Sequence, residues 1–243
     1  MLDDGPIATP SLATIAKEWD ELAPVRDIQI ADGRDVSFSH ILAPRLTSWI
    51  QEHRPSRLVD VGCGTGRLTE LLAVHVPHVV GIDISGESIR IARERCANED
   101  IGFVHSTIEA YAESHTREFD FAIANMVLMD TPNVRDVLRA ISSVLKPWGR
   151  IAFTVTHPCF WPSYWGYDKM DWYDYHREIA IRGEFRTRMS RTGKATTHFH
   201  RSLESYMTAL NATGFALELF SELPLDDEPR FIAAVAQIDG RLT

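Results

Sequence analysis

Three glycines and one acidic residue have the spacing that most clearly predicts chemistry in this sequence. Gly62, Gly64 and Gly66 follow the apolar run Leu58–Val61 in the pattern G-x-G-x-G. Glycine is required where the backbone takes a positive φ or where a ligand comes close to the main chain. Asp83 ends the next apolar run, 21 residues after Gly62, where a carboxylate can accept both hydroxyls of a ribose. The pattern predicts a nucleoside-type ligand at a strand-to-helix turn.

A second acidic residue, Asp60, lies two positions before the first of these glycines. A carboxylate at the buried end of a strand is costly without a partner, so we expect Asp60 to meet a hydrogen-bond donor or a cation. The glycine spacing differs from the G-x-G-x-x-G of NAD-binding oxidoreductases, which argues against that class of enzyme.

Two of the ten histidines are candidates for a catalytic base. His157 follows the apolar run Ile151–Val155, and His200 lies at the far end of an aromatic-rich segment. Imidazole titrates near neutral pH, so either residue suits proton transfer. The alternative for each is a hydrogen bond that only holds a loop in place. His198 alternates with His200 and, with His157, would allow a three-histidine metal site. No carboxylate signature accompanies them, and no metal is expected.

Short apolar runs alternate with amphipathic segments between residues 56 and 158. The runs are Leu58–Val61, Val79–Ile82, Phe103–Val104, Phe119–Ala124 and Ile151–Val155. They lack period-two polarity, which is typical of parallel strands buried on both faces. The clearest helix is expected to have Thr131 as its N-cap and Pro132 at its first position, and to end at Lys146. The alternation predicts an α/β fold with a doubly wound sheet.

The chain is expected to form a single domain in four parts. These are an N-terminal helical cap (1–55), a cofactor-binding core (56–158), an insert that acts as a lid or pocket wall (159–201) and a C-terminal helix with two strands (202–243). Residues 158–201 hold ten of the 23 Phe, Trp and Tyr residues. The candidate substrate-binding residues are Phe160, Trp161, Tyr164, Trp165 and Tyr173. The alternative is that these rings only pack the insert onto the sheet.

The core resembles the class I S-adenosylmethionine (SAM)-dependent methyltransferases. Asp60–Gly66 matches their first motif, Val80–Ser85 the second, Phe119–Asn125 the fourth-strand motif and Lys146–Arg150 the turn into the fifth strand. The resemblance implies a Rossmann-like, seven-stranded, mostly parallel sheet with an antiparallel last strand. It also implies SAM as cofactor, with S-adenosyl-L-homocysteine (SAH) as its product. The implied reaction is in-line transfer of a methyl group to an oxygen or nitrogen of a small organic acceptor.

The same resemblance implies roles for individual residues. The implied cofactor-binding residues are Asp60, Gly62, Cys63, Gly64, Asp83, Ile84, Ser106, Thr107, Ile108, Asn125 and Met126. Gly62 and Gly64 would run beside the methionine part of SAM, and Asp83 would hold the ribose. Ile84 and the segment Ser106–Glu109 would contact the adenine, and Asn125 and Met126 would lie near the sulfonium. Ser106 or Thr107 stands where many relatives have Asp, and Trp148 replaces a turn glycine.

Two short segments outside the core resemble a subgroup that methylates small molecules. They are His157–Phe160 (HPCF) and His200–Leu203, in which Ser202 stands where Pro is usual. Between them, Arg182–Lys194 is basic and suits a phosphate or carboxylate, an RNA acceptor or a solvated hairpin. The alternatives to a small-molecule enzyme are an RNA or tRNA methyltransferase and a non-catalytic SAM-binding protein.

The composition and charge of the chain exclude some classes of partner and of protein. The chain has 243 residues and a formal charge of −9, which argues against duplex nucleic acid as a partner. Its 44% hydrophobic and 24% charged residues exclude intrinsic disorder. The N-terminus MLDDGPIATP lacks the features of a signal peptide, and Ile151–Tyr167, the longest stretch without charge, contains prolines. We expect a soluble cytoplasmic monomer or homodimer with no membrane contact.

Overall fold

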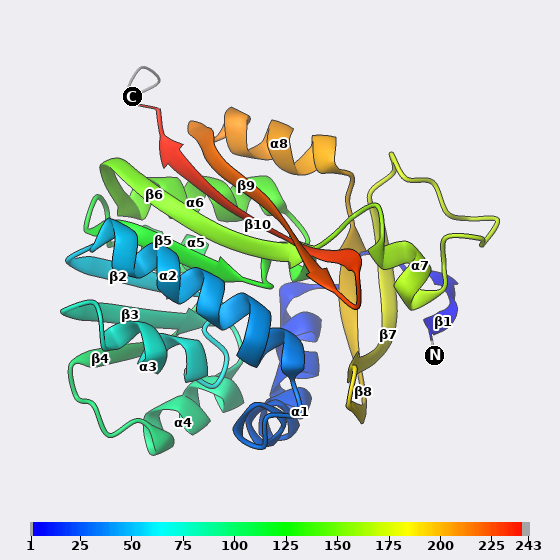
Figure 1. Ribbon diagram of the computed structural model, residues 1–243, viewed down its shortest axis with the longest axis horizontal. Coiled ribbons are helices and arrows are strands. Elements are labelled where there is room, and N and C mark those ends of the chain that lie inside the picture. Colours follow the sequence, from blue (N-terminus) through cyan, green and yellow to red (C-terminus); the bar gives the residue numbers. More distant parts are fainter. Residues whose placement is uncertain (1, 240–243) are drawn as a thin grey trace.

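A seven-stranded sheet forms the centre of the protein (Figure 1). The computed structural model describes residues 2–239. The strand order is β4 (Ile101–His105), β3 (His78–Asp83), β2 (Arg57–Val61), β5 (Phe119–Asn125), β6 (Leu145–Thr156), β10 (Glu228–Ile238) and β9 (Phe215–Leu225). The pairs from β4 to β6 are parallel, whereas β10 runs antiparallel to both of its neighbours. The predicted fold, including the antiparallel last strand, is confirmed.

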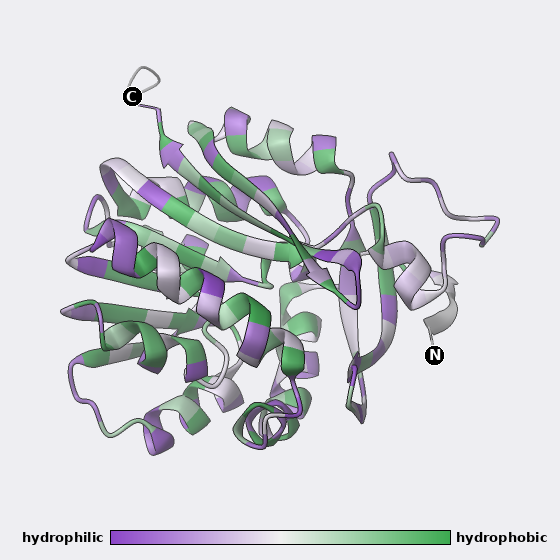
Figure 2. Cartoon of the chain, in the orientation of Figure 1, coloured by the Kyte–Doolittle hydropathy of each residue, from purple (hydrophilic) through white to green (hydrophobic). Residues whose placement is uncertain are grey.

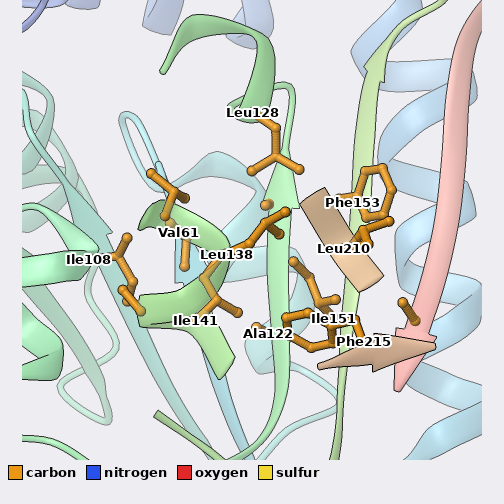
Figure 3. Close-up of a cluster of buried hydrophobic side chains, with 14 of the residues drawn as sticks. Val61, Ile108, Ala122, Leu128, Leu138, Ile141, Ile151, Phe153, Leu210 and Phe215 are labelled. Atoms are coloured by element: carbon orange, nitrogen blue, oxygen red, sulfur yellow. The ribbon is translucent and has the colours of Figure 1, made fainter. Parts of the chain in front are cut away.

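Helices bury both faces of this sheet, which explains why its strands are apolar without alternation. On one face lie α5 (Ile108–Ala112), α6 (Val134–Val144) and α8 (Leu203–Ala212); on the other lie α2 (Ala43–His53) and α3 (Arg67–Ala73). Within β2, Val59 and Val61 belong to the cluster on the first face and Leu58 to the cluster on the second. Figure 3 shows the first cluster, where Leu138 and Ile141 of α6 lie among side chains of the central strands.

The start of α6 differs from the prediction. The helix begins at Val134 with Asn133 as its N-cap, whose side chain accepts a hydrogen bond from the Asp136 N–H. The hydroxyl of Thr131 instead donates to the Leu128 carbonyl at 3.1 Å, so it closes the short helix η2 (Leu128–Asp130). The helix ends at Val144, because β6 begins at the next residue.

The insert and the N-terminal region together build a second sheet that the sequence did not predict. β1 (Leu2–Pro6) pairs with β7 (Ile179–Thr187), which pairs with β8 (Ser190–His200). The N-terminal region also contains α1 (Leu12–Ala31) and the π-helix η1 (Phe38–Leu42), and the insert contains α7 (Trp161–Trp165). Figure 1 shows the second sheet beside the carboxyl ends of the parallel strands, with α1 between it and α4 (Gly86–Arg95). This arrangement leaves space for ligands between the two sheets.

Hydropathy follows the layers. In Figure 2 the central strands are largely hydrophobic, and hydrophilic residues lie on the outer parts of the flanking helices and loops. No helix within residues 2–239 combines the length and the apolar character needed to cross a bilayer.

Candidate active site

Two adjoining cavities lie at the carboxyl ends of the parallel strands. The larger has a volume of about 410 Å³ and the smaller of about 90 Å³. Five residues line both cavities: Asp35, Met126, Met129, Asp130 and Phe185. All eleven residues expected to bind the cofactor line the larger cavity. In open α/β sheets this edge is where ligands bind.

The glycine turn forms one wall of the larger cavity. Gly62 has φ +68°, and a Cβ there would lie 2.3 Å from Cγ2 of Val127. Gly64 has φ +55°, and a Cβ there would have no atom within 4 Å. Gly62 is therefore needed for packing, whereas Gly64 presents bare backbone to open space. A ligand can approach the main chain closely at Gly64.

The two acidic residues near this turn have different partners. Asp83 accepts hydrogen bonds from the N–H of Gly64 (2.8 Å) and of Ser85 (2.7 Å), one on each carboxylate oxygen. Each oxygen has a second lone pair for a ligand. Asp60 is buried, and its carboxylate accepts a 2.7 Å hydrogen bond from the Thr69 hydroxyl, so the donor expected for Asp60 is Thr69. Burial raises the pKa of both carboxyls, that of Asp60 to about 7.

On the side of the larger cavity where the adenine is expected, the hydroxyls of Ser106 and Thr107 are hydrogen-bonded to the backbone. Thr107 caps α5 by accepting a hydrogen bond from the Ala110 N–H, and the Ser106 hydroxyl donates to the Thr107 carbonyl. Neither hydroxyl replaces the carboxylate that many relatives have here. Ile84 and Ile108 add apolar wall.

Strand β5 ends in a fixed turn beside both cavities. Met126 has a left-handed backbone with φ +57°, which is unusual for a residue with a side chain. Its N–H donates to the carbonyl and the hydroxyl of Thr154 in β6, both at 3.0 Å. The Thr154 hydroxyl in turn donates to Asn125 Oδ1 at 2.7 Å. Thr154 is therefore hydrogen-bonded to both residues expected near the sulfonium, a role that no sequence pattern indicated.

Helix α1 closes the larger cavity and was not expected to contribute. Its Trp19 and Ala23 line the cavity. Asp20 accepts hydrogen bonds from the Ser85 hydroxyl (2.7 Å) and the Glu87 N–H (3.0 Å). Asp27 forms a bidentate pair with Arg67, with both distances 2.8 Å. In a sequence, such acidic residues look like a solvated helix face.

The two histidines predicted as bases lie outside both cavities. His157 is buried; its Nε2 lies 2.8 Å from Glu222 Oε1, and its Nδ1 accepts a hydrogen bond from the Cys159 N–H. His200 Nε2 lies 3.1 Å from the carbonyl of Tyr175, and its Nδ1 lies 3.4 Å from the Tyr167 hydroxyl. Both ring nitrogens of each histidine therefore lie beside other groups of the protein, which does not support their prediction as catalytic bases. Burial lowers the pKa of His200 to about 4.

The five aromatic residues expected to bind the substrate differ in whether they line a cavity. Trp161, Tyr164 and Trp165 line the smaller cavity. Tyr173 instead packs on Tyr167, with ring centroids 5.4 Å apart, in an apolar cluster against which Trp161 and Trp165 also pack. Phe160 lies outside both cavities and makes an edge contact with His157 at 4.7 Å. Three of the five expected substrate-binding residues are therefore at a cavity.

A carboxyl–imidazole pair stands at the junction of the cavities. Asp130 lines both cavities, His198 lines the smaller one, and Asp130 Oδ1 lies 3.7 Å from His198 Nδ1. Burial lowers the pKa of His198 to about 3, so this imidazole is held neutral, and burial raises the pKa of Asp130. The nearby Arg201 lowers the pKa of His198 further and opposes the rise at Asp130. From the sequence, His198 was considered only as a member of a possible three-histidine metal site.

No group of three or more His, Cys, Asp or Glu side chains in the described part of the chain is arranged to hold a metal ion. The Arg182–Lys194 segment forms the β7–β8 hairpin, in which Arg182 pairs with Glu18, Arg188 with Asp226 and Lys194 with Glu21. Much of its charge is therefore balanced by acidic residues elsewhere in the chain.

Comparison with known proteins agrees with this geometry. Residues 58–149 match the family model of a methyltransferase domain. A ubiquinone biosynthesis O-methyltransferase of Aromatoleum aromaticum is 28% identical over 126 residues, which are 50% of this chain and 54% of that protein. The chain thus spans about half the length of the curated relatives it matches.

Two solved structures share the fold. The 1,6-didemethyltoxoflavin-N1-methyltransferase of Burkholderia thailandensis, solved with 1,6-didemethyltoxoflavin and SAH, is 18% identical with a TM-score of 0.62, over 96% of this chain and 94% of that chain. An S-adenosylmethionine dependent methyltransferase of Mesorhizobium loti is 22% identical with a TM-score of 0.59, over 80% of this chain and 96% of that one. These two likenesses show the fold that this chain shares, and the family match shows a methyltransferase domain over residues 58–149.

Proposed function

We propose that this protein transfers a methyl group from SAM to an oxygen or nitrogen of a small, flat organic acceptor. The observation that carries the proposal is the junction of the two cavities at the end of β5, where Met126, Met129 and Asp130 line both. A cofactor in the larger cavity and an acceptor in the smaller one would meet there. Holding two reactants in such a geometry removes much of the entropic barrier of a bimolecular reaction.

The larger cavity has the features that SAM requires. Asp83 offers a free lone pair on each carboxylate oxygen to the two ribose hydroxyls, and Gly64 gives the methionine part access to the backbone. When bound, SAM supplies a methyl group on a positively charged sulfur, which needs no further activation. The protein must then position the acceptor, exclude water and remove a proton. Helix α1, held by Asp20 and Asp27, covers the cavity and serves the exclusion of water.

His198 is placed to act as the base that accepts the proton of the acceptor. Its neutral imidazole lines the acceptor cavity, and Asp130 stands beside it. As the acceptor oxygen or nitrogen forms its bond to the methyl carbon, its remaining proton becomes strongly acidic. Even a weak base can then accept this proton. The Asp130 carboxyl, 3.7 Å away, orients the ring. A positioned base of this kind contributes about 10²–10⁴-fold to rate.

A small aromatic acceptor fits better than RNA. Trp161, Tyr164 and Trp165 offer flat surfaces in the smaller cavity, whose volume is only about 90 Å³. The basic hairpin is largely ion-paired, and the chain carries a net charge of −9. The structural neighbour from Burkholderia was solved with 1,6-didemethyltoxoflavin, and the curated relative is a ubiquinone biosynthesis O-methyltransferase. These likenesses support a small acceptor without naming it.

The test is transfer of label from methyl-labelled SAM to a library of small aromatic compounds, with mass spectrometry of the products. We expect a labelled small molecule, and no label with the Asp83→Ala variant. Label that appears only in added tRNA would favour the RNA alternative. Tight SAH binding without transfer to any compound or RNA would favour a non-catalytic SAM-binding protein.

A further inference from the structure

The smaller cavity contains a cation that no acidic residue of the described part of the chain neutralises. Three arginines line it: Arg186, Arg188 and Arg230. Arg188 pairs with Asp226, and Arg230 pairs with Glu228 at 2.6 Å. The guanidinium of Arg186 donates only to the carbonyl of Tyr164, at 3.2 Å, and no carboxylate within the described residues forms an ion pair with it. Arg186 therefore keeps most of its donors for another anion.

A second donor in the same wall is also without a partner. The indole Nε1 of Trp161 is buried and has no hydrogen-bond partner within residues 2–239. Buried donors are nearly always satisfied, and leaving one unpaired costs about 1–3 kcal/mol. Because Trp161 lines the smaller cavity, a ligand oxygen is the natural partner for this donor. The observation is independent of the charge on Arg186.

The acidic residues at this cavity do not cancel its positive charge. Asp35 is already engaged, pairing with Arg26 at 2.8 Å and accepting a hydrogen bond from the Phe38 N–H. Burial raises the pKa of Asp130, which disfavours the charged form of that carboxyl. The cavity therefore favours a negatively charged group.

Tyr164 places this charge beside a flat surface. The guanidinium carbons of Arg230 and Arg186 lie 4.6 Å and 5.6 Å from the centre of its ring. A cavity of about 90 Å³ is smaller than the cavity of about 150 Å³ known to take a benzene molecule. A ring bound here must therefore extend into the junction with the larger cavity, toward Met126 and Asp130.

From these observations we propose that the acceptor is an aromatic carboxylate, whose carboxylate binds Arg186 and Trp161 while its hydroxyl or amino group, at the other end of the ring, lies at the junction. The inference rests on the proposed function, because it names the acceptor class of the same site. Charge-assisted hydrogen bonds from an arginine to a carboxylate are about twice as strong as neutral ones, so they select this class.

The experiment compares matched acceptors. Hydroxy- and aminobenzoates and their uncharged carboxamides are offered to the enzyme with labelled SAM, and kcat and KM are measured for each pair. We expect the carboxylates to be preferred at least tenfold in kcat/KM. Arg186→Gln should raise KM for the carboxylates more than tenfold with kcat changed little, and should remove the preference over the amides. Trp161→Phe should reduce the preference while keeping the ring.

The control is Arg191→Gln, in the same hairpin. Arg191 is exposed, lies outside both cavities and contacts Glu184 at 3.9 Å. This variant should keep the wild-type preference. Equal or better use of the amides, or an unchanged KM in Arg186→Gln, would overturn the inference and leave the proposed function standing. Absence of transfer to both series would overturn the inference, and the proposed function would fall with it only if no compound of the wider library is methylated.

Discussion

The carboxyl of Asp130 faces the imidazole of His198 at 3.7 Å, across the point where the two cavities meet. One residue comes from η2, directly after β5, and the other from β8 of the insert. The pair therefore exists only when the insert sheet is docked on the core. This links the docking of the insert to the chemistry.

Replacing this imidazole tests whether it accepts the proton. We expect His198→Gln to lower kcat by about 10²-fold, since the contribution of a positioned base is lost, with SAH affinity changed less than twofold. His176→Gln is the control, because His176 lies exposed in the same insert. Steady-state kinetics and calorimetry measure the two quantities. An unchanged kcat in His198→Gln would exclude this base.

The pH profile gives a second test of the same residue. Because burial lowers the pKa of His198 to about 3, its ring stays neutral from about pH 5 upward. We therefore expect no loss of kcat between pH 8 and pH 5 that depends on His198. An acidic limb near pH 6.5 that disappears in His198→Gln would contradict the burial seen here.

Asp60 should make the stability of the ligand-free protein depend on pH. Its pKa is raised by burial to about 7, whereas a model carboxyl has 3.8, so the folded state binds a proton more tightly than the unfolded state. The resulting stabilisation is complete below pH 4 and is lost as pH rises toward 7. At 1.36 kcal/mol per pKa unit, the loss is on the order of a few kcal/mol.

Asp60→Asn removes this titration. We expect its free energy of unfolding in urea to fall less than that of wild type between pH 5 and pH 8. The neighbouring strand provides the control. The pKa of Asp120 is lowered, because hydrogen bonds from Lys146 and Ser56 outweigh the effect of burial. Asp120→Asn should lose stability at pH 7, and the loss should shrink as pH falls toward 3. Parallel pH curves for wild type and Asp60→Asn would contradict the raised pKa.

Asp83 should control cofactor binding. The Asp83 carboxylate accepts hydrogen bonds from the N–H groups of Gly64 and Ser85. Asp83→Ala removes this carboxylate, and with it the acceptor proposed for the ribose hydroxyls. We expect SAH affinity to fall by well over tenfold, because two charge-assisted hydrogen bonds are lost. Calorimetry measures the change. Unchanged affinity would refute the assignment of Asp83 to the ribose.

His157 and His200 should affect stability more than turnover. Removing the His157 ring leaves the Cys159 N–H without its acceptor and Glu222 without its partner. We expect His157→Ala and His200→Ala to lower the Tm by several degrees, while kcat at a temperature where each is folded stays within about threefold. A large fall in kcat at unchanged Tm would favour their predicted role as bases.

The sequence predicted the parts of the fold that follow from local pattern. The apolar runs gave β2 to β6 because strands buried on both faces need no polar alternation. The hydrophobic pattern did not predict the strands that form only because they pair with a segment far away in the sequence. β1 gave no strand signal, since its partner β7 is more than 170 residues away. Thr131 has the chemistry of an N-cap, but its hydroxyl closes the preceding turn.

The site shows the same division. The cofactor residues lie in one short turn and at strand ends, so their spacing alone brought them together. The acceptor residues come from four distant elements, and nothing in the spacing joins Asp130 to His198. The sequence favoured His157 and His200 because they lie at the ends of elements, but His157 contacts Glu222 of β9 and His200 contacts the Tyr175 carbonyl of the insert.

The first two glycines of the turn should fail in different ways when an alanine replaces them. In Gly62→Ala the Cβ would lie 2.3 Å from Val127, which is packed beside β5, so the core must shift. We expect this variant to lose several degrees of Tm. In Gly64→Ala the Cβ enters open space at φ +55°, so the cost to the fold is only the left-handed strain, about 1–2 kcal/mol.

That open space is where the methionine part of SAM would lie, so Gly64→Ala should lose SAH affinity by at least tenfold. Thermal unfolding and calorimetry on both variants separate the two effects, because Tm reports the fold and SAH binding reports the cavity. Tight SAH binding by a folded Gly64→Ala protein would show that the ligand keeps its distance from this backbone. The cofactor's position beside the turn would then have to be abandoned, even though the fold would be unaffected.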